Sequence, residues 1–240
     1  SSKTSLADLA SFRRRAKIIR TVRPISIIKS ERIGNFSFFI VEDVRSARRF
    51  LKKVNKDINI DELTFFTLNQ HTDLTEIGKY LDPIFKGNDM GIISEAGCPA
   101  IADPGADVVR IAQTKRIIVK PLVGPSSILL SLMGSGFNGQ SFAFLGYLPI
   151  KEGERRKAIE KLEQRIYKED QTQIFIETPY RNMKLVDELT SICRSQTKLC
   201  IASNVTIDDE YIVTRTIDEW KKEKSQLSIE KKPTIFLLYK

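Results

Sequence analysis

Short runs of β-branched and aromatic residues alternate with amphipathic stretches from Phe36 onward, and this alternation constrains the fold most strongly. The β-branched and aromatic runs predict strands at 36–41, 63–68, 90–93, 117–119, 142–147, 173–177, 198–202, 211–216 and 234–239. Apolar residues at three- and four-residue spacing predict helices at 44–54, 74–85, 106–114, 126–133, 154–168 and 180–193. Because strands that alternate with helices usually form parallel sheets, we predict an α/β fold with a mainly parallel sheet.

The alternation pauses at a glycine-containing turn near 138–140, and beyond residue 150 the predicted helices become more charged. A chain of 240 residues is long enough for two units of about 120 residues each. We therefore predict an N-terminal α/β domain at 36–139, with helices on both faces of its sheet, and a C-terminal α/β domain at 140–240 with a smaller mixed sheet. Residues 1–35 show no sustained periodicity, and we assign no element to this atypical basic segment.

Composition excludes several classes of protein. No apolar run approaches the roughly 20 residues of a membrane helix, and the N-terminal segment with Arg13, Arg14 and Arg15 lacks the apolar stretch of a secretory signal. We expect a cytoplasmic protein with no membrane partner. The three cysteines form no C-x-x-C pair, and the presence of a single histidine, His71, excludes a two-histidine metal site. We expect no metal, since any metal would have carboxylates alone as ligands.

Positive charge is concentrated near the N-terminus. The chain carries a net charge of +9, and residues 1–32 contribute +7 of it through nine basic and two acidic side chains, so the other 208 residues carry +2. A basic segment of this kind is either a solvated arm or a contact surface for an anionic partner such as RNA. The charge distribution leaves both interpretations open.

The segment from Ser94 to Gly105 has the clearest features of a binding site. It follows a predicted buried strand, precedes a predicted helix, and is rich in glycine, proline, alanine and acidic residues. In a parallel sheet such a loop lies at the carboxyl edge, where ligands bind. Gly97 and Gly105 would allow positive φ angles, and Pro99 and Pro104 would stiffen the loop. An ordinary connection is the weaker alternative, because such loops usually contain about two to six residues.

Two further glycine-containing segments have different predicted roles. The turn at 121–127 follows the next predicted strand and would place backbone donors along the same sheet edge, with Ser126 or Ser127 capping the following helix. The segment at 134–139 matches the G-x-G-x-x-G pattern of dinucleotide-binding proteins. That pattern requires a strand before it and a helix after it, whereas here a predicted helix precedes it and a strand follows. We therefore predict a helix C-cap and a turn at 134–139.

Four linked motifs resemble those of a known family. They are Ser-Glu-Ala-Gly-Cys-Pro-x-x-Ala-Asp-Pro-Gly at 94–105, Val-Gly-Pro-Ser-Ser at 123–127, Gly-Tyr-Leu-Pro-Ile-Lys at 146–151 with Glu-Arg-Arg at 154–156, and Glu-Thr-Pro-Tyr-Arg at 177–181. In order and approximate spacing they resemble the tetrapyrrole methylase superfamily. Within it, they and the Glu-Asp-Val-Arg segment at 42–45 are most similar to the branch that methylates a ribose 2′-hydroxyl of cytidine in small-subunit ribosomal RNA.

This resemblance implies two α/β domains with S-adenosylmethionine bound in the cleft between them. It also implies a homodimer, and ribosomal RNA or the small ribosomal subunit as a partner. Positions that match the family's motifs are expected to contact the cofactor, largely through backbone groups: Ser94, Glu95, Ala96, Gly97, Pro99, Gly124, Ser126, Ser127, Leu148, Thr178 and Pro179.

Two segments depart from the family's pattern. Family members begin with an apolar strand and a turn rich in proline and glycine, and residues 1–35 contain no convincing version of them. Either this first strand has diverged or the N-terminal sequence is altered, for example by a change of reading frame. Ala-Ser-Asn-Val-Thr at 202–206 stands where the ribosomal RNA branch has Ala-Arg-Glu-Leu-Thr-Lys, which leaves the acceptor open.

Four side chains are candidates for a catalytic role. His71 follows a predicted strand, aligns with the second histidine of the family's His-x-His stretch, and is of the residue type that titrates near neutrality. It could assist removal of a hydroxyl proton, or it could be a structural or surface histidine. Lys151, Glu177 and Arg181 lie in the motifs and could bind substrate phosphate or orient the substrate, but a salt bridge explains each of them as well.

Three functional hypotheses follow. The first is an S-adenosylmethionine-dependent methyltransferase acting on a ribose 2′-hydroxyl of ribosomal RNA. The second is a methyltransferase of small, tetrapyrrole-like molecules, as in other branches of the superfamily. The third, motivated by the N-terminal departure, is a cofactor-binding or RNA-binding protein that has lost catalysis. Cofactor binding separates the third hypothesis from the others, and the acceptor separates the first from the second.

Overall fold

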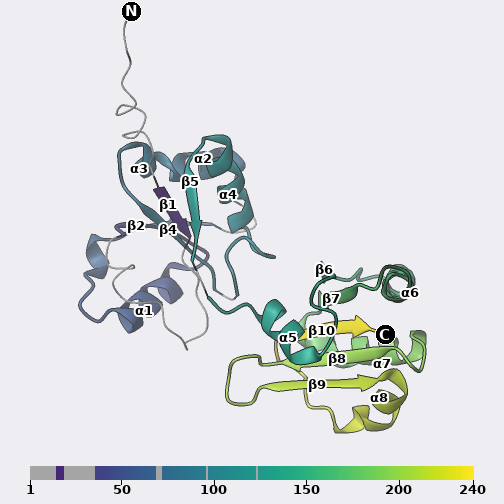
Figure 1. The fold of residues 1–240 in the computed structure, drawn as a ribbon. Coiled ribbons are helices and arrows are strands. Elements are labelled where there is room, and N and C mark those ends of the chain that lie inside the picture. The colour runs from purple at the N-terminus through teal and green to yellow at the C-terminus, as the bar shows by residue number, and fades with distance from the viewer. Residues whose placement is uncertain (1–14, 19–35, 69–71, 96, 123) are drawn as a thin grey trace, which may run out of the picture. The chain divides into compact units, whose positions relative to one another are not determined.

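The chain forms two units in the computed structural model, which describes residues 15–18, 36–68, 72–95, 97–122 and 124–240 (Figure 1). The first unit is Ser1–Pro125 and the second is Ser126–Lys240. This division assigns the helix that follows Pro125 to the second unit, whereas the predicted boundary at 139/140 lies after that helix.

Five parallel strands form the sheet of the first unit, in the order β3-β2-β4-β1-β5. The strands are β1 at Arg15–Ile18, β2 at Phe38–Val41, β3 at Thr64–Thr67, β4 at Met90–Ile93 and β5 at Ile118–Pro121. Their pairing confirms the predicted α/β fold. Because the strands are parallel, the loops that leave their C-terminal ends lie at one edge of the sheet.

Helices cover both faces of this sheet, as predicted. Ile40 of β2 belongs to an apolar cluster with residues of α2 (Leu74–Tyr80), α3 (Asp82–Phe85) and α4 (Gly105–Thr114). Its neighbours Phe39 and Val41 belong to a second cluster with Ala47 and Leu51 of α1 (Val44–Val54). Successive strand residues point to opposite faces, so β2 contributes to the apolar clusters on both sides of the sheet.

Strand β1 lies within residues 1–35, where no element was predicted. It pairs with β4 on one side and β5 on the other, and Lys17 lies opposite Gly91 and Lys120. Four residues within a basic segment show too little alternation of apolar and polar positions to predict a strand. The first unit therefore has a first strand near the middle of its sheet, and the other residues of 1–35 lie outside the described residues.

The second unit contains another five-stranded sheet, in the order β6-β7-β10-β8-β9. Its strands are β6 at Phe142–Tyr147, β7 at Thr172–Ile176, β8 at Lys198–Ser203, β9 at Tyr211–Thr216 and β10 at Thr234–Tyr239. Only the β6–β7 pair is parallel within this described sheet, which confirms the predicted mixed character. A smaller sheet was predicted here, but each of the two described sheets has five strands.

Helices also lie on both faces of the second sheet. One apolar cluster joins α6 (Glu152–Glu169), α7 (Asn182–Ile192) and α8 (Ile217–Glu223) to β7, β8 and β10. The opposite cluster includes Leu132 of α5 (Ser127–Ser135). Gly136 has a φ angle of 76° and caps α5, which confirms the helix end predicted for the G-x-G-x-x-G match.

Several helices differ in detail from the prediction. The helix predicted at 74–85 is divided into α2 and α3, because Pro83 has no N–H group with which to continue α2. The helix predicted at 180–193 begins as a 3-10 turn, η3 (Pro179–Arg181), and α8 was not predicted. Further 3-10 turns are η2 (Ile60–Glu62) and η4 (Lys224–Gln226). None of the helices in the described ranges is long and apolar enough to cross a membrane.

Candidate functional site

The predicted ligand loop at 94–105 lies at the carboxyl edge of the first sheet, directly after β4. The neighbouring strand β2 ends at Val41, and the next residue, Glu42, contacts this loop. The backbone N–H of Glu95 donates a hydrogen bond of 2.7 Å to Oε1 of Glu42. The first turn of the loop is therefore held by a side chain from the adjacent strand end.

Asp103 organises the middle of the loop. Its Oδ1 accepts hydrogen bonds from the backbone N–H groups of Gly105 at 2.7 Å and Ala100 at 3.1 Å. Ala100 and Ala102 have positive φ angles of 68° and 54°, a backbone conformation that residues other than glycine adopt with some strain. The loop is thus a tightly bent structure that depends on one carboxylate.

The two glycines of the loop have different roles. Gly97 has a φ angle of 70°, as predicted. Gly105 instead begins α4, and the prediction of a positive φ there is wrong. A Cβ atom at Gly105 would lie 2.7 Å from Oδ1 of Asp103 and 3.2 Å from the N atom of Ala100. Gly105 is therefore required because it leaves room for the Asp103 hydrogen bonds.

Glu42 has the most unusual electrostatic environment of this edge. Burial raises its pKa from 4.5 to about 7, and the nearby acidic groups Asp103 and Glu95 add to this effect, while the hydrogen bond from the Glu95 N–H opposes it. Asp103 raises the pKa of Glu42 both through its charge and as a hydrogen-bond partner of the protonated carboxyl group. Glu42 is thus an acid that can hold its proton near neutral pH.

The second predicted turn, at 121–127, contacts the same loop. The thiol of Cys98 donates a long hydrogen bond of 3.8 Å to the carbonyl oxygen of Pro125. The loops after β4 and β5 therefore meet at one sheet edge. Ser126 is the N-cap residue of α5 and Ser127 its first residue, but the Ser126 side chain makes no capping hydrogen bond. The predicted position of the cap is confirmed, and the predicted side-chain bond is not formed by Ser126.

A buried hydroxyl at this edge fits a polar ligand. Ser94 is 2% exposed, and its Oγ has no hydrogen-bond partner among the described residues. Buried polar atoms are nearly always hydrogen-bonded, so an unpartnered hydroxyl at a loop of this kind fits a ligand's polar group. Glu95 is exposed and Pro99 is buried, whereas Ala96 lies outside the described residues.

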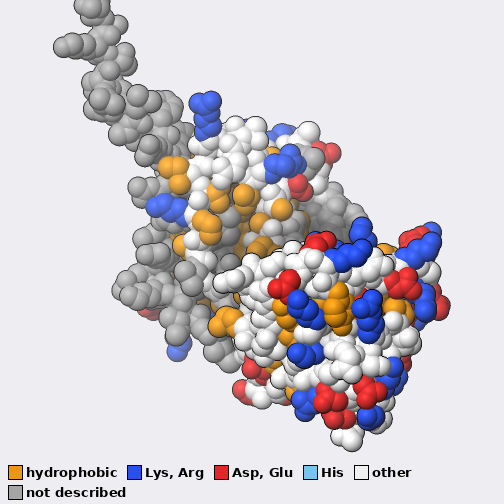
Figure 2. Space-filling view, turned by 45° about the vertical axis from the view of Figure 1, so that its right-hand side comes forward, with side chains coloured by type: hydrophobic (Ala, Val, Ile, Leu, Met, Phe, Trp, Pro, Cys, Tyr) orange, Lys and Arg blue, Asp and Glu red, His pale blue; other side chains and the backbone are white. Residues whose placement is uncertain are grey.

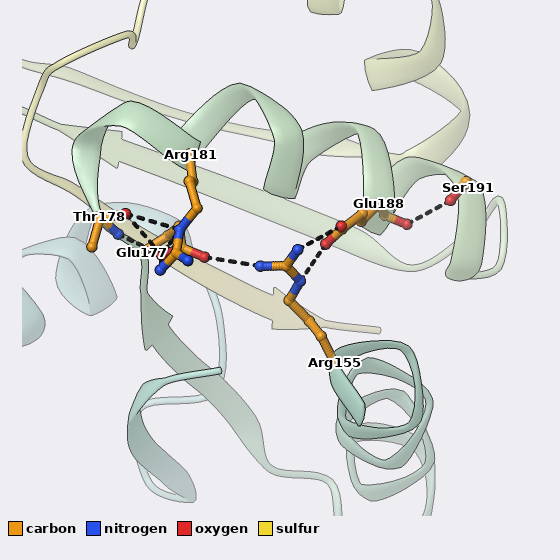
Figure 3. A network of polar contacts seen from close by, with 6 residues as sticks. All are labelled: Arg155, Glu177, Thr178, Arg181, Glu188 and Ser191. Carbon is orange, nitrogen blue, oxygen red and sulfur yellow. Dashed lines mark hydrogen bonds and ion pairs between the residues drawn. The ribbon is translucent and has the colours of Figure 1, made fainter. Parts of the chain in front are cut away.

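In the second unit, Glu177 and Arg181 belong to a partly buried ionic network at the end of β7 (Figure 3). The Glu177 side chain is 2% exposed, and its Oε1 accepts hydrogen bonds from Arg181 Nη2 at 2.7 Å and from Thr178 N at 2.6 Å. Arg155 of α6 lies between two carboxylates, with Nη1 3.3 Å from Glu177 Oε2 and Nη2 2.7 Å from Glu188 Oε1. The network joins α6, the end of β7 and α7.

The other predicted site residues lie in varied surroundings. Lys151 is the N-cap residue of α6, and its exposed amine lies 3.5 Å from Glu154. Leu148 is buried in the apolar cluster of the second unit, so its backbone is the part available to a ligand. Thr178 and Pro179 begin the η3 turn. His71 lies outside the described residues, and its predicted role stays a prediction.

The residue patterns gave no sign of the contacts made by two side chains, Glu42 and Arg155. Glu42 appeared in a matching motif without an assigned role, and Arg155 appeared in another. Contacts between residues far apart in the sequence give both their importance, with Glu42 bonded to Glu95 and Arg155 bonded to Glu188. In the described part of the chain, no group of three or more histidine, cysteine, aspartate or glutamate side chains is placed to hold a metal ion.

Comparison with known proteins identifies the family. "Ribosomal RNA small subunit methyltransferase I" of Hydrogenobaculum sp. (strain Y04AAS1) is 30% identical to this chain over 210 residues, which cover 85% of this chain and 84% of the relative. The chain belongs to the ribosomal RNA small subunit methyltransferase I family. A relative of the same name in Micromonospora olivasterospora is 28% identical over 199 residues, and one in Haemophilus influenzae is 30% identical over 162 residues.

The chain spans less than two thirds of the length of some of these relatives. The aligned region covers 59% of the Micromonospora protein and 56% of the Haemophilus protein. No family model matches the chain. The predicted resemblance to the methyltransferase superfamily is nonetheless confirmed by the relatives and by solved structures of the same fold.

Solved structures of other proteins have the same fold as this chain. The methyltransferase CobJ superposes with a TM-score of 0.60 at 12% identity, covering 94% of this chain and 93% of CobJ. Uroporphyrin-III C-methyl transferase from Thermus thermophilus, complexed with S-adenyl homocysteine, superposes with a TM-score of 0.53 at 13% identity, covering 94% and 97%. Both confirm the predicted fold class.

Proposed function

We propose that this chain is an S-adenosylmethionine-dependent methyltransferase that modifies a ribose 2′-hydroxyl of small-subunit ribosomal RNA. The observation that carries the proposal is the 30% identity to a ribosomal RNA small subunit methyltransferase I over 84% of that relative's length. A ribosomal substrate also agrees with the expected cytoplasmic location.

The first unit supplies the better defined part of the proposed cofactor site. Ser94, Glu95, Ala96, Gly97 and Pro99 belong to the loop after β4, and Gly124, Ser126 and Ser127 to the connection after β5. The hydrogen bond between Cys98 and Pro125 supports a common site for these two loops. The unpartnered Oγ of Ser94 would meet a polar group of S-adenosylmethionine.

We propose that Leu148, Thr178 and Pro179 of the second unit also contact the cofactor. The ionic network fixes the η3 turn, because Glu177 accepts hydrogen bonds from both Thr178 and Arg181. We propose that Glu177 and Arg181 act by holding this turn in shape, because their charges already neutralise each other. Lys151 is exposed and can approach substrate phosphate. The proposed assembly is a homodimer.

S-adenosylmethionine supplies an electrophilic methyl group when it is bound. The chain must therefore orient the acceptor hydroxyl in line with that group and help to remove its proton. The loop around Asp103 would help to orient the bound molecules, because hydrogen bonds already set its conformation. His71 is the proposed base, and Lys151 is the proposed contact to the acceptor's phosphate.

Transfer of labelled methyl groups tests the proposal. The acceptors are small ribosomal subunits from a strain that lacks its own enzyme of this family, and we expect incorporation into RNA that depends on the chain. Absence of incorporation at saturating enzyme would contradict the proposed acceptor. Labelling of porphyrin precursors instead would support a small-molecule methyltransferase.

Calorimetric titration with S-adenosylmethionine and S-adenosylhomocysteine tests the site. The Ser94→Ala variant should bind about three- to tenfold more weakly, since one hydrogen bond is lost. Ser131→Ala is the matched control, because Ser131 of α5 is also buried with an unpartnered hydroxyl among the described residues. Failure of the wild-type chain to bind either compound would contradict the proposed methyltransferase activity.

A further inference from the structure

Helix α1 and the turn after it carry a strongly unbalanced positive charge. Residues 44–56 contain six basic side chains and no acidic one: Arg45, Arg48, Arg49, Lys52, Lys53 and Lys56. Residues 33–240 carry a net charge of +2, so with this segment at +6 the other residues of that range sum to −4. The part of the chain that follows the basic N-terminal segment therefore concentrates its positive charge here.

The basic side chains lie on the exposed side of an amphipathic helix. Ala47 and Leu51 are buried in the apolar cluster of the sheet. Arg45, Arg49 and Lys52 are exposed, and their spacing of four and three residues places them in a row along the helix. This row rises by about 10 Å, at roughly 1.5 Å per residue. Lys53 and the exposed Lys56 extend it toward the end of the helix.

Most of these cations form no close ion pair in the described part of the chain. Arg48 pairs with Asp61 at 2.7 Å, whereas the other five have no carboxylate within 4.0 Å among the described residues. Arg45 and Arg49 interact with the exposed carboxylate of Asp43 at longer range. Helices of the second unit differ, since Arg156 pairs with Glu160 in α6 and Lys222 with Asp218 in α8. On the face of that unit in Figure 2, blue and red side chains are accordingly interspersed.

The row of cations begins beside the proposed catalytic edge. Asp43 caps α1 by accepting a hydrogen bond of 2.7 Å from Ser46 N, and the preceding residue, Glu42, holds the cofactor loop. The first turn of α1 is thus fixed at the carboxyl edge of the sheet, and the helix runs away from that edge along the sheet's face. An acceptor that reaches the edge would lie next to Arg45.

We propose that the exposed basic side of α1 binds the phosphate backbone of the acceptor RNA next to the nucleotide that is methylated. This inference rests on the proposed function. Arginine and lysine side chains bind nucleic acid chiefly through phosphates and independently of base sequence. A membrane surface fits less well, because the apolar side of α1 is buried in the core and has no apolar surface to insert into lipid.

The test combines three charge-removing substitutions, Arg49→Gln, Lys53→Gln and Lys56→Gln, which leave the cofactor loop and Arg45 intact. Affinity for in vitro transcribed small-subunit ribosomal RNA is measured between about 50 and 200 mM salt. We expect weaker binding and a slope of log affinity against log salt that is shallower by about 2 to 3, since each phosphate contact contributes about 0.7 to 0.9. Arg49→Lys should bind like the wild type.

The matched control removes three exposed lysines from α6, with Lys157→Gln, Lys161→Gln and Lys168→Gln. These substitutions change the net charge equally and should leave the slope nearly unchanged. Calorimetry with S-adenosylhomocysteine should show the same cofactor affinity in both triple variants.

Two outcomes would overturn the inference: an unchanged slope in the α1 variant, or an equal loss in the α6 control. Absence of RNA binding by the wild-type chain would overturn it as well. Failure of the proposed function is a separate result, in which the wild-type chain binds RNA through α1 but transfers no methyl group to small ribosomal subunits.

Discussion

Gly105 illustrates how a single residue can be required for space. It begins helix α4 with an ordinary backbone conformation, yet a Cβ atom there would collide with Oδ1 of Asp103 at 2.7 Å. Asp103 in turn accepts the two backbone hydrogen bonds that shape the loop. Three residues of this edge therefore shape the loop together. Gly105 leaves room for Asp103, Asp103 accepts hydrogen bonds from the loop backbone, and Glu42 accepts one from Glu95.

Replacement of Gly105 by alanine should destabilise the first unit by about 1–3 kcal/mol, because the loop must shift to admit the methyl group. Gly78→Ala is the matched control. A Cβ atom at Gly78, in α2, would have no heavy atom within 4 Å, so alanine should stabilise the helix by about 0.5–1 kcal/mol. Urea unfolding measures both values. Equal effects of the two substitutions would contradict the proposed collision.

Glu42 should make the stability of the first unit depend on pH. Its pKa is raised from 4.5 to about 7 in the folded chain, so the folded state keeps a proton that the unfolded chain releases between these values. The resulting contribution is fully present below pH 4.5 and is lost as the pH rises through about 7. Wild-type protein should therefore lose stability between about pH 4.5 and about pH 7, the range in which the unfolded chain has released the proton that folded Glu42 still holds.

Glu42→Gln keeps the side chain neutral and should reduce this loss, as measured by urea unfolding at the two pH values. Glu76→Gln, at an exposed position of α2, is the control and should retain the wild-type dependence. The same pH dependence in wild type and Glu42→Gln would show that another group is responsible.

At the scale of elements, Arg155 connects two helices and a strand end of the second unit. It is 2% exposed and bridges Glu177 and Glu188. Its neighbour Arg156, on the same helix, is exposed and pairs with Glu160 one turn later. The two arginines have the same chemistry and adjacent positions, but their burial differs, and burial determines the energetic effect of removing each one.

Arg155→Met should destabilise the second unit by about 3–5 kcal/mol, because it leaves a buried carboxylate with fewer partners. Arg156→Met should cost about 0.5 kcal/mol or less. Chemical denaturation followed by the fluorescence of Trp220, which is buried in this unit, measures both changes. A similar small effect of both substitutions would mean that the network adds little to stability.

At the scale of the whole molecule, the two sheets are assembled from segments that are distant in sequence. Strand β1 pairs with β4 and β5, more than 70 residues further along the chain. Its low apolar content shows that backbone pairing within a sheet can recruit a segment that has no clear pattern of its own. The second sheet likewise places β10, the last strand, between β7 and β8.

Proline substitutions in β1 test its place in the sheet. Ala16→Pro and Lys17→Pro each remove a backbone donor from a strand with neighbours on both sides, and each should destabilise the first unit by at least about 1–3 kcal/mol. Thr67→Pro in β3 is the control, since β3 is at the edge of the sheet and pairs with β2 alone among the described strands. Thermal unfolding compares the three variants, and wild-type stability in both β1 variants would exclude β1 from the sheet.

Local patterns were sufficient to predict most elements of this protein. The strands predicted at 142–147 and 211–216 agree at both ends with β6 and β9, and the helix predicted at 44–54 agrees with α1. Periodicity and capping depend on residues near one another in the chain, which is why they can be recognised there. The motif at 94–105 was located for the same reason, since a buried strand, a bent loop and a helix follow one another.

The sequence by itself determined the fold class, the family and the position of the loop at 94–105, because each depends on the order of residues along the chain. Tertiary structure alone decided that β1 lies between β4 and β5, that Glu42 holds the Glu95 turn, and that Gly105 leaves room for Asp103. It also separated the buried Arg155 from the exposed Arg156. These features depend on pairing, burial and close approach between distant residues, and such contacts exist only once the chain has folded.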